Sequence, residues 1–236
     1  MKANGISDVG KIRQNNEDSF YCSLETALFI VADGLGGHSA GEVASSMTVE
    51  HVSNGKPKNI DDLLLLISEA NTKVHNEAKA VGNDMATTIS SLILPEKNQV
   101  YIAHVGDSRI YLIRDNEIYC ITEDHTPVME SLREGLLTLE QSKRHPLRHM
   151  LSRTIGTHPE VEIDAINIDI LSGDIFVLCT DGLSNLHEDY EIRDIVLKDI
   201  SEANIISKNL VESALERGGT DNVSVVVLII EDSDII

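Results

Sequence analysis

Short apolar runs alternate with amphipathic stretches along the chain, and each kind of pattern predicts a different element. Residues 27–32 (ALFIVA) form a continuous apolar run that ends at Asp33-Gly34, which is typical of a strand buried on both faces. A helix is expected to follow over residues 40–53. Residues 61–80 predict a second helix, because apolar side chains recur there at steps of three and four and make one apolar face.

The middle and the end of the chain predict further strands and two more helices. Four strands are expected in succession, over residues 87–94, 99–105, 108–113 and 117–121. The turns Gly106-Asp107 and Asp115-Asn116 suit hairpins, so we expect these four strands to form one antiparallel sheet. The later elements are a strand over 174–179, helices over 189–198 and 202–216, and a last strand over 223–230.

Residues 125–160 interrupt this pattern with a polar and basic stretch, which we expect to cross over the sheet in short helical segments. No linker, low-complexity stretch or fixed-period repeat marks a boundary, so residues 1–236 are expected to form one domain. Strands joined by hairpins, with helices in pairs, favour an α+β fold with antiparallel sheets over an alternating βαβ fold.

Composition narrows the possible partners and the compartment. The 236 residues include 39 Asp and Glu against 19 Lys and Arg, and the net charge of −20 repels both nucleic acid and anionic membranes. The longest apolar runs stop far short of the ~20 residues of a spanning helix, and the polar N-terminus lacks a signal sequence, so we expect a cytoplasmic protein. Cys22, Cys120 and Cys179 are odd in number and widely spaced, which predicts reduced, buried thiols.

Four aspartates stand at the ends of predicted strands. Asp33-Gly34-Leu35 and Asp181-Gly182-Leu183 each follow a buried strand, Asp107 closes a third strand, and Asp221 precedes the last one. Taken singly, an Asp-Gly after a strand is an ordinary turn. If the four strand ends converge, however, each pair of carboxylates at about 4 to 5 Å would repel by ~3 to 4 kcal/mol at an effective dielectric near 20. Only a bound cation makes such a cluster stable.

A cluster of this kind points to hard cations and to phosphate chemistry. Because all its ligands are oxygens, Mg²⁺ or Mn²⁺ is favoured over zinc or copper. Two such ions that share a carboxylate would hold a bridging water, lower its pKa and clamp both oxygens of an in-line displacement. Hydrolysis of a phosphate ester follows naturally, and the bound cations would offset the repulsion between a phosphate and a protein of charge −20.

Short motifs follow one another over nearly the whole length of the chain. They are Ser7-Asp8-Val9-Gly10 with Arg13, Asn16, Glu17 and Asp18; Asp33-Gly34-Leu35-Gly36-Gly37-His38-Ser39-Ala40-Gly41-Glu42; Ala86-Thr87-Thr88; His104-Val105-Gly106-Asp107-Ser108-Arg109; Glu123-Asp124-His125-Thr126; Leu151-Ser152-Arg153-Thr154-Ile155-Gly156; Thr180-Asp181-Gly182-Leu183; and Gly219-Thr220-Asp221-Asn222-Val223. In this order they resemble the motifs of the PPM (type 2C) metal-dependent serine/threonine protein phosphatases, in the stand-alone bacterial form.

The resemblance implies a fold and a metal centre. The fold is a four-layer α-β-β-α sandwich, in which two antiparallel sheets are flanked by helix pairs. The centre holds two Mn or Mg ions: Asp33 bridges them, Gly34 offers its backbone carbonyl, and Asp181 and Asp221 complete the ligands. Asp107, together with Asp181, is expected to hold a third, weaker ion.

The resemblance also implies roles for side chains around the ions. Arg13 matches the residue that grips the substrate phosphate, and Asp18 matches an acid that supports the metal-bound waters. His38 is expected to protonate the leaving alkoxide as a general acid, a role that an imidazole can fill near neutral pH. Residues 125–155 match a flap that tunes substrate choice in the family, although a charge-rich stretch of this kind is also typical of a solvated face.

The activity implied is hydrolysis of phosphoserine and phosphothreonine in proteins by attack of a metal-bridging hydroxide. The expected partners are phosphorylated protein substrates of a serine/threonine kinase, and the chain is expected to be a monomer.

Two alternatives remain open. Gly37-His38-Ser39-Ala40-Gly41 satisfies G-x-S-x-G, the nucleophile elbow of serine hydrolases, with Ser39 as the nucleophile. That elbow turns directly from strand to helix, whereas four residues, Asp33-Gly34-Leu35-Gly36, follow the predicted strand here. The second alternative is a catalytically silent, phosphatase-like binding module, although such a protein would usually have lost a metal ligand.

Overall fold

Residues 1–36, 40–96 and 98–235 are described by the computed structural model, and within them two five-stranded antiparallel sheets lie face to face. The first sheet has the order β1 (Lys2–Asp8), β12 (Val223–Ile229), β11 (Ile175–Cys179), β8 (Arg109–Arg114), β9 (Glu117–Cys120). The second has the order β10 (Asp164–Asp169), β7 (Gln99–Val105), β6 (Ile89–Glu96), β3 (Leu28–Ala32), β2 (Ser19–Ser23).

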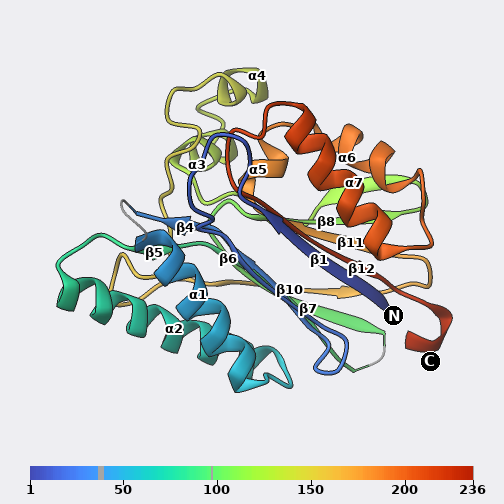
Figure 1. Ribbon diagram of the computed structural model, residues 1–236, viewed down its shortest axis with the longest axis horizontal. Helices are drawn as coiled ribbons and strands as arrows, with labels where there is room; N and C mark the ends of the chain where they lie inside the picture. Colours follow the sequence, from blue (N-terminus) through green and yellow to red (C-terminus); the bar gives the residue numbers. More distant parts are fainter. Residues whose placement is uncertain (37–39, 97, 236) are drawn as a thin grey trace.

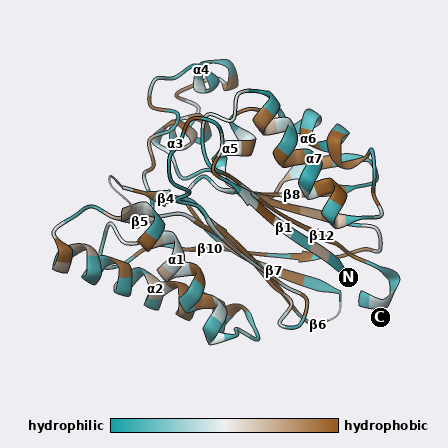
Figure 2. Ribbon diagram, viewed as in Figure 1, coloured by the Kyte–Doolittle hydropathy of each residue, from teal (hydrophilic) through white to brown (hydrophobic). Residues whose placement is uncertain are grey.

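Helices cover the outer face of each sheet, which gives four layers (Figure 1). One pair, α1 (Ala40–Gly55) and α2 (Ile60–Val81), lies on the second sheet, and the other, α6 (Asp189–Val196) and α7 (Ala203–Glu216), lies on the first. Figure 2 shows that these helices turn hydrophobic stripes inward and polar stripes outward. The predicted α-β-β-α sandwich is therefore confirmed.

The remaining elements are short. They are the strands β4 (Gly34–Leu35) and β5 (Ala86–Thr87), which pair with each other, the helices α3 (Pro127–Arg133), α4 (Leu139–Lys143) and α5 (Asp181–Ser184), and a 3-10 turn, Asp232–Asp234. Figure 1 shows α3, α4, α5, β4 and β5 at one end of the sandwich. Among the described residues, no helix combines the length and the apolar character needed to cross a bilayer.

Strand β3 is buried on both faces, as its unbroken apolar run predicts. Leu28, Ile30 and Ala32 pack against α1 and α2, whereas Phe29 and Val31 lie in the core between the two sheets. Successive side chains of a strand point to opposite faces, so a strand in an inner layer must be apolar at every position. The same alternation holds for β11 and β12.

Helix α2 follows its amphipathic pattern. It begins after Asn59, whose side chain accepts a hydrogen bond from the Asp62 backbone N–H at 2.8 Å. It ends at Gly82, which takes the left-handed conformation with φ of 75° and donates its N–H to the Ala78 carbonyl. Both are standard ways to satisfy the unpaired groups at helix ends.

One connection differs from the prediction. β6 pairs with β7 in one sheet and β8 with β9 in the other, so the expected hairpin at Gly106-Asp107 is instead a crossing between sheets. Gly106 has φ of 114°, and a Cβ there would lie 2.5 Å from Thr88 Cγ2. The expected single sheet of four successive strands is therefore wrong, because strands that are apolar on both faces do not reveal which sheet they join.

Strands β1, β2 and β10 are absent from the prediction. All three lie at sheet edges, and their side chains are mostly half-buried or exposed. Edge strands carry polar residues that weaken the apolar pattern on which prediction depends. The thiols are buried at Cys179 and half-buried at Cys22 but exposed at Cys120, where the prediction of burial is wrong.

Candidate metal centre

A cleft of about 660 Å³ opens at the end of the sandwich where α5 and β4 lie. Among its lining residues are Arg13, Asp33, Gly34, Asp181 and Asp221, all of which the sequence predicts for the site. Asp33 follows β3, Asp181 begins α5 directly after β11, and Asp221 lies just before β12. The strand ends that carry these three aspartates therefore converge, which is the condition on which the predicted carboxylate cluster depends.

A second cleft, of about 580 Å³, adjoins the first and contains Asp107. Asp181, Asn185, Arg148 and His149 line both clefts, so the two spaces meet at these residues. Asp107 thus lies near Asp181 but away from Arg13, which lines only the first cleft.

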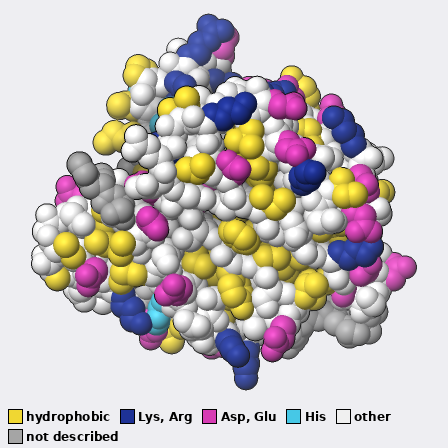
Figure 3. Space-filling model, viewed as in Figure 1, with side chains coloured by type: hydrophobic (Ala, Val, Ile, Leu, Met, Phe, Trp, Pro, Cys, Tyr) yellow, Lys and Arg dark blue, Asp and Glu magenta, His cyan; other side chains and the backbone are white. Residues whose placement is uncertain are grey.

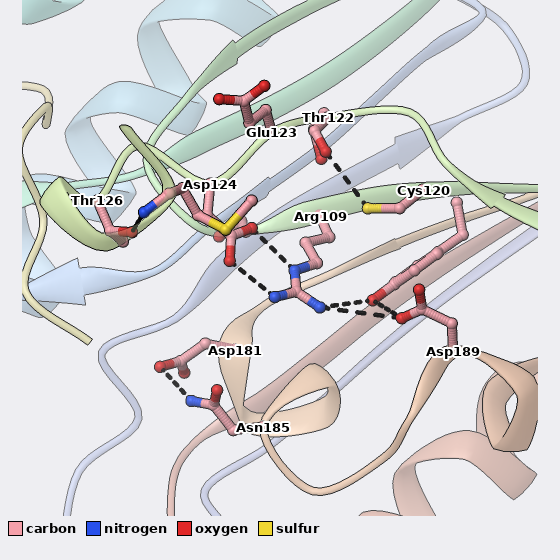
Figure 4. Close-up of polar contacts among 12 residues, drawn as sticks. Arg109, Cys120, Thr122, Glu123, Asp124, Thr126, Asp181, Asn185 and Asp189 are labelled. Carbon is pink, nitrogen blue, oxygen red and sulfur yellow. Dashed lines mark hydrogen bonds and ion pairs between the residues drawn. The ribbon is translucent and has the colours of Figure 1, made fainter. Parts of the chain in front are cut away.

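The wall of the second cleft contains an arginine, Arg109, whose guanidinium is bound by neighbouring side chains. The Arg109 Nε and Nη2 atoms donate to the two carboxylate oxygens of Asp124 at 2.8 and 2.7 Å. Figure 4 shows the guanidinium between Asp124 and Asp189. With its donors used in this way, Arg109 holds the wall together and is not a free phosphate ligand.

The backbone around Asp33 is fixed by two threonines on the neighbouring segment. The Asp33 N–H donates to Thr88 Oγ1 at 2.9 Å, and the Asp33 carbonyl accepts from Thr87 Oγ1 at 2.7 Å. Gly34 follows in a tight space, because a Cβ there would lie 2.2 Å from the Gly41 carbonyl oxygen and 2.4 Å from that of Glu17. The Asp-Gly pair is therefore required by packing as well as by the turn.

Asp18 is only 8% exposed and lies close enough to Asp33 and Asp181 to repel them electrostatically. Its Oδ2 atom accepts hydrogen bonds from Thr180 Oγ1 at 2.8 Å and from Ser224 Oγ at 2.7 Å. Its Oδ1 atom is buried and has no hydrogen-bond partner among the residues that the structure describes. Burial raises the pKa of this carboxyl to about 7. One oxygen is thus left to bind a group that is not part of the protein.

Electrostatics indicate that the cluster requires positive charge. The pKa of Asp33 is raised well above its usual range by burial and by repulsion from Asp181, Asp18 and Asp107. Burial and the nearby Asp181 raise the pKa of Asp107 to about 8, and burial and Asp221 raise the pKa of Asp181. Divalent cations favour the ionised form of each carboxyl, so these residues suit a metal site.

The donor set also suits a hard ion. In the described parts of the chain, no three His, Cys, Asp or Glu side chains are gathered closely enough to hold an ion by themselves. Mg²⁺ in proteins commonly takes only one or two carboxylates and keeps several waters. Oxygen ligands from Asp33, Asp181, Asp221 and the Gly34 backbone fit that kind of site.

Arg13 lies in the exposed loop between β1 and β2, and its Nη2 atom is 2.9 Å from Asp221 Oδ2. The two side chains are 52% and 34% exposed, so this ion pair contributes little to stability. The guanidinium can therefore exchange the carboxylate for a phosphate at little cost. His38, the predicted general acid, and Ser39 belong to residues 37–39, outside the described residues.

Two asparagines organise the site, although the sequence alone assigns a role to neither of them. Asn185 Nδ2 donates to Asp181 Oδ2 at 2.9 Å (Figure 4), a pairing that the i, i+4 spacing at α5 could have revealed. Asn222 accepts from the Glu17 N–H at 2.8 Å and donates to the carbonyls of Val9 and Asn15, each at 2.9 Å. These partners are more than 200 residues away in sequence, so no local pattern indicates them.

Residues 125–155, which the sequence matches to a flap, place their basic side chains in two different surroundings. Arg148 and His149 line the clefts, whereas Arg133 and Arg144 form exposed ion pairs with glutamates. Figure 3 shows hydrophobic as well as basic side chains over this end of the molecule. The antiparallel pairing of the described strands also argues against the nucleophile elbow at 37–41, which belongs to a parallel sheet.

Comparisons with known proteins agree on one family. Residues 11–205 match the family described as protein phosphatase 2C. Protein phosphatase PhpP of Streptococcus pneumoniae is 35% identical over an alignment of 250 positions, gaps included, which covers 99% of each chain. The crystal structure of the Mycobacterium tuberculosis serine/threonine phosphatase PstP/Ppp superposes with a TM-score of 0.90 at 34% identity, over 98% of each chain. A second structure, the catalytic domain of PstP in complex with two manganese ions, gives a TM-score of 0.88 at 33% identity, again over 98% of each chain.

Proposed function

The chain belongs to the protein phosphatase 2C family, and we propose that it is a divalent-cation-dependent phosphatase that hydrolyses phosphoserine and phosphothreonine in proteins. The observation that carries this function is the convergence of Asp33, Asp181 and Asp221 in one cleft, with raised pKa values at Asp33 and Asp181. A binding module that had lost its chemistry would have no reason to keep such a costly set of carboxylates together.

The residues that would hold the cations follow from the cleft. The related PstP domain carries two manganese ions, and for this chain we assign two Mn²⁺ or Mg²⁺ ions to Asp33, the Gly34 carbonyl, Asp181 and Asp221. Asp107, with Asp181, is assigned to a third ion. When bound, such ions make water nucleophilic at neutral pH and neutralise the charge of the phosphate.

The protein's own groups bind and orient the substrate. Arg13, at the mouth of the cleft, donates to phosphate oxygens and compensates for the acidic surroundings, since its planar fork matches two oxygens at once. The unpartnered Oδ1 atom of Asp18 accepts a hydrogen bond from a water in the cleft. His38 gives a proton to the serine or threonine oxygen as the phosphorus–oxygen bond breaks.

From the sequence we propose further that residues 1–236 fold as one domain and that the protein is a monomer. We also propose that it acts in the cytoplasm, on proteins phosphorylated by a serine/threonine kinase.

Phosphate release from a phosphothreonine peptide tests the proposal directly. The assay compares Mn²⁺, Mg²⁺ and a chelator, and includes a phosphotyrosine peptide of the same sequence. We expect release that requires a cation and that favours phosphothreonine. A folded protein that releases phosphate under none of these conditions would instead be a binding module, and cation-independent release would contradict the assignment of the carboxylates.

A further inference from the structure

His125 lies where residues 126–152, called here the flap segment, leave the sandwich. It directly precedes Thr126, the N-cap of α3, and only 6% of its surface is exposed. The second cleft runs between the flap segment on one side and Asp107 and Asp181 on the other. A buried histidine at this point is not used by the proposed chemistry.

Backbone hydrogen bonds bring both ends of the flap segment to this residue. The His125 N–H donates to the Gly106 carbonyl at 2.8 Å, and the Ser152 N–H donates to the His125 carbonyl at 2.9 Å. His125 therefore connects the start and the end of the flap segment to the turn that carries Asp107.

The imidazole ring strengthens the same connection. The Gly106 N–H donates to His125 Nδ1 at 3.0 Å. An N–H can only donate, so Nδ1 carries no proton, and the proton of the neutral ring lies on Nε2. From there it is donated to Asp164 Oδ2 at 3.2 Å. Arg153 Nη1 also lies 3.2 Å from Nε2, but a protonated Nε2 cannot accept from it, and Nη1 donates instead to the other oxygen of Asp164 at 2.6 Å.

The ring is held from its other side by a second histidine. The His104 ring lies with its centroid 4.7 Å from that of His125. His104 is itself fixed, because its Nδ1 atom is 2.8 Å from Ser90 Oγ and its Nε2 atom is 3.1 Å from the Glu123 carbonyl. Few alternative positions are left to the His125 ring.

From this geometry we infer that His125 is a positioning residue for Asp107. Gly106 precedes Asp107 and has φ of 114°, and because glycine has the widest choice of backbone conformations, the turn needs outside support to stay in this one. His125 supplies it by binding both the N–H and the carbonyl of Gly106. His125 thereby connects the flap segment, through its backbone, to the turn that carries Asp107, and its side chain adds a hydrogen bond to that turn. This inference rests on the proposed function, in which Asp107 is a cation ligand.

The test uses the whole protein and four variants. His125→Ala removes the ring, and His125→Asn keeps an acceptor close to the position of Nδ1. Asp107→Asn removes the ligand itself. Leu210→Ala, on the buried face of α7, is a control that lowers stability far from the site. Two quantities are measured: the Mn²⁺ concentration for half-maximal phosphate release, and the hydrogen-exchange rate of the Gly106 amide in chelator.

We expect His125→Ala to raise the half-maximal Mn²⁺ concentration about tenfold, as loss of a group that orients a metal ligand commonly does. Exchange at Gly106 should become about tenfold faster, the factor expected for a lost buried hydrogen bond. His125→Asn should restore both quantities most of the way, because its side-chain oxygen can accept from Gly106.

Three results would overturn the inference. Unchanged Mn²⁺ dependence and exchange in His125→Ala would show that the ring supports nothing. Equal changes in Leu210→Ala would assign the effect to global stability. An unchanged Mn²⁺ dependence in Asp107→Asn would show that Asp107 binds no ion, which separates an error in the proposed ligand set from an error about His125.

Discussion

The raised pKa values of the aspartate cluster predict an unusual pH dependence for the metal-free protein. A carboxyl whose pKa is higher in the folded state than in the unfolded state holds its proton longer when folded. Stability is then highest at low pH and falls as pH rises toward the folded pKa. Asp33, Asp107 and Asp18 all have raised pKa values, so metal-free protein should lose stability between pH 6.5 and 8.

The magnitude follows from the separate groups. A carboxyl that stays protonated in the folded state but is ionised in the unfolded state lowers the free energy of unfolding by about 1.4 kcal/mol for each pH unit. Over the ~1.5 units from pH 6.5 to 8, such a group lowers it by ~2 kcal/mol. Asp107, with a pKa of about 8, comes close to this value, Asp18, with a pKa of about 7, contributes less than half of it, and the raised pKa of Asp33 acts in the same direction. The free energy of unfolding should fall by roughly 2 to 4 kcal/mol in total.

The pH window keeps the contribution of the buried histidines small. Burial lowers the pKa of His104 to about 4, which is below the ordinary value of about 6.5. Its contribution to stability therefore rises with pH, as do those of His125 and His187, whose pKa values are also lowered by burial. Because an unfolded histidine is half protonated at pH 6.5, each of them offsets only about 0.4 kcal/mol of the fall between pH 6.5 and 8.

The assay is urea unfolding in chelator at pH 6.5 and at pH 8, repeated with saturating Mn²⁺ and with Asp33→Asn. Mn²⁺ should stabilise the protein more at pH 8, because cations compete with protons for the carboxylates. Asp33→Asn should show a smaller pH effect in chelator, since one of the groups with a raised pKa is gone. A metal-free protein whose stability is constant or rises from pH 6.5 to 8 would refute this description of the cluster.

Three substitutions test other parts of the structure. Arg13→Ala should raise KM for a small phosphoester about tenfold with little change in kcat, as loss of uniform binding does, and steady-state kinetics that show an unchanged KM would remove Arg13 from the site. Gly34→Ala should cost about 3 kcal/mol in urea unfolding, because its Cβ would meet the Gly41 carbonyl at 2.2 Å, whereas Gly82→Ala, with open space around it, should cost about 1 kcal/mol. Arg114→Ala should cost about 3 to 5 kcal/mol, because Asp174, whose side chain is 1% exposed, would lose a partner 2.6 Å away. The exposed Arg144→Ala serves as its control and should cost less than about 1 kcal/mol, and equal losses would contradict the role of burial.

The sequence predicts the inner strands of the fold well and the edges poorly. Strands β3, β11 and β12 are apolar at nearly every position because both their faces are buried, so their composition reveals them. β1, β2 and β10 lie at sheet edges and carry polar residues, and they were missed. The crossing at Gly106 was also missed, since a Gly-Asp turn suits a hairpin as well as a change of sheet.

In the candidate site too, residues marked by a local sequence motif are predictable, and residues that act through contacts distant in sequence are not. Asp33 and Asp181 are predictable because each ends an apolar strand with the same Asp-Gly-Leu motif. Asn222 and His125 act through contacts with the backbone of segments that are distant in sequence, and only the three-dimensional structure shows them. Asp181 lines both of the adjoining clefts, and the spacing of motifs along the sequence does not reveal this either.

The central claim is that the aspartate cluster binds the cations on which phosphatase activity depends. Its most direct test is calorimetric titration with Mn²⁺ together with phosphate release on the same samples of wild type, Asp33→Asn and the exposed control Asp61→Asn. We predict that Asp33→Asn loses both high-affinity Mn²⁺ binding and Mn²⁺-dependent release while remaining folded, and that Asp61→Asn behaves like the wild type. Retention of Mn²⁺-dependent phosphate release in Asp33→Asn would contradict the claim.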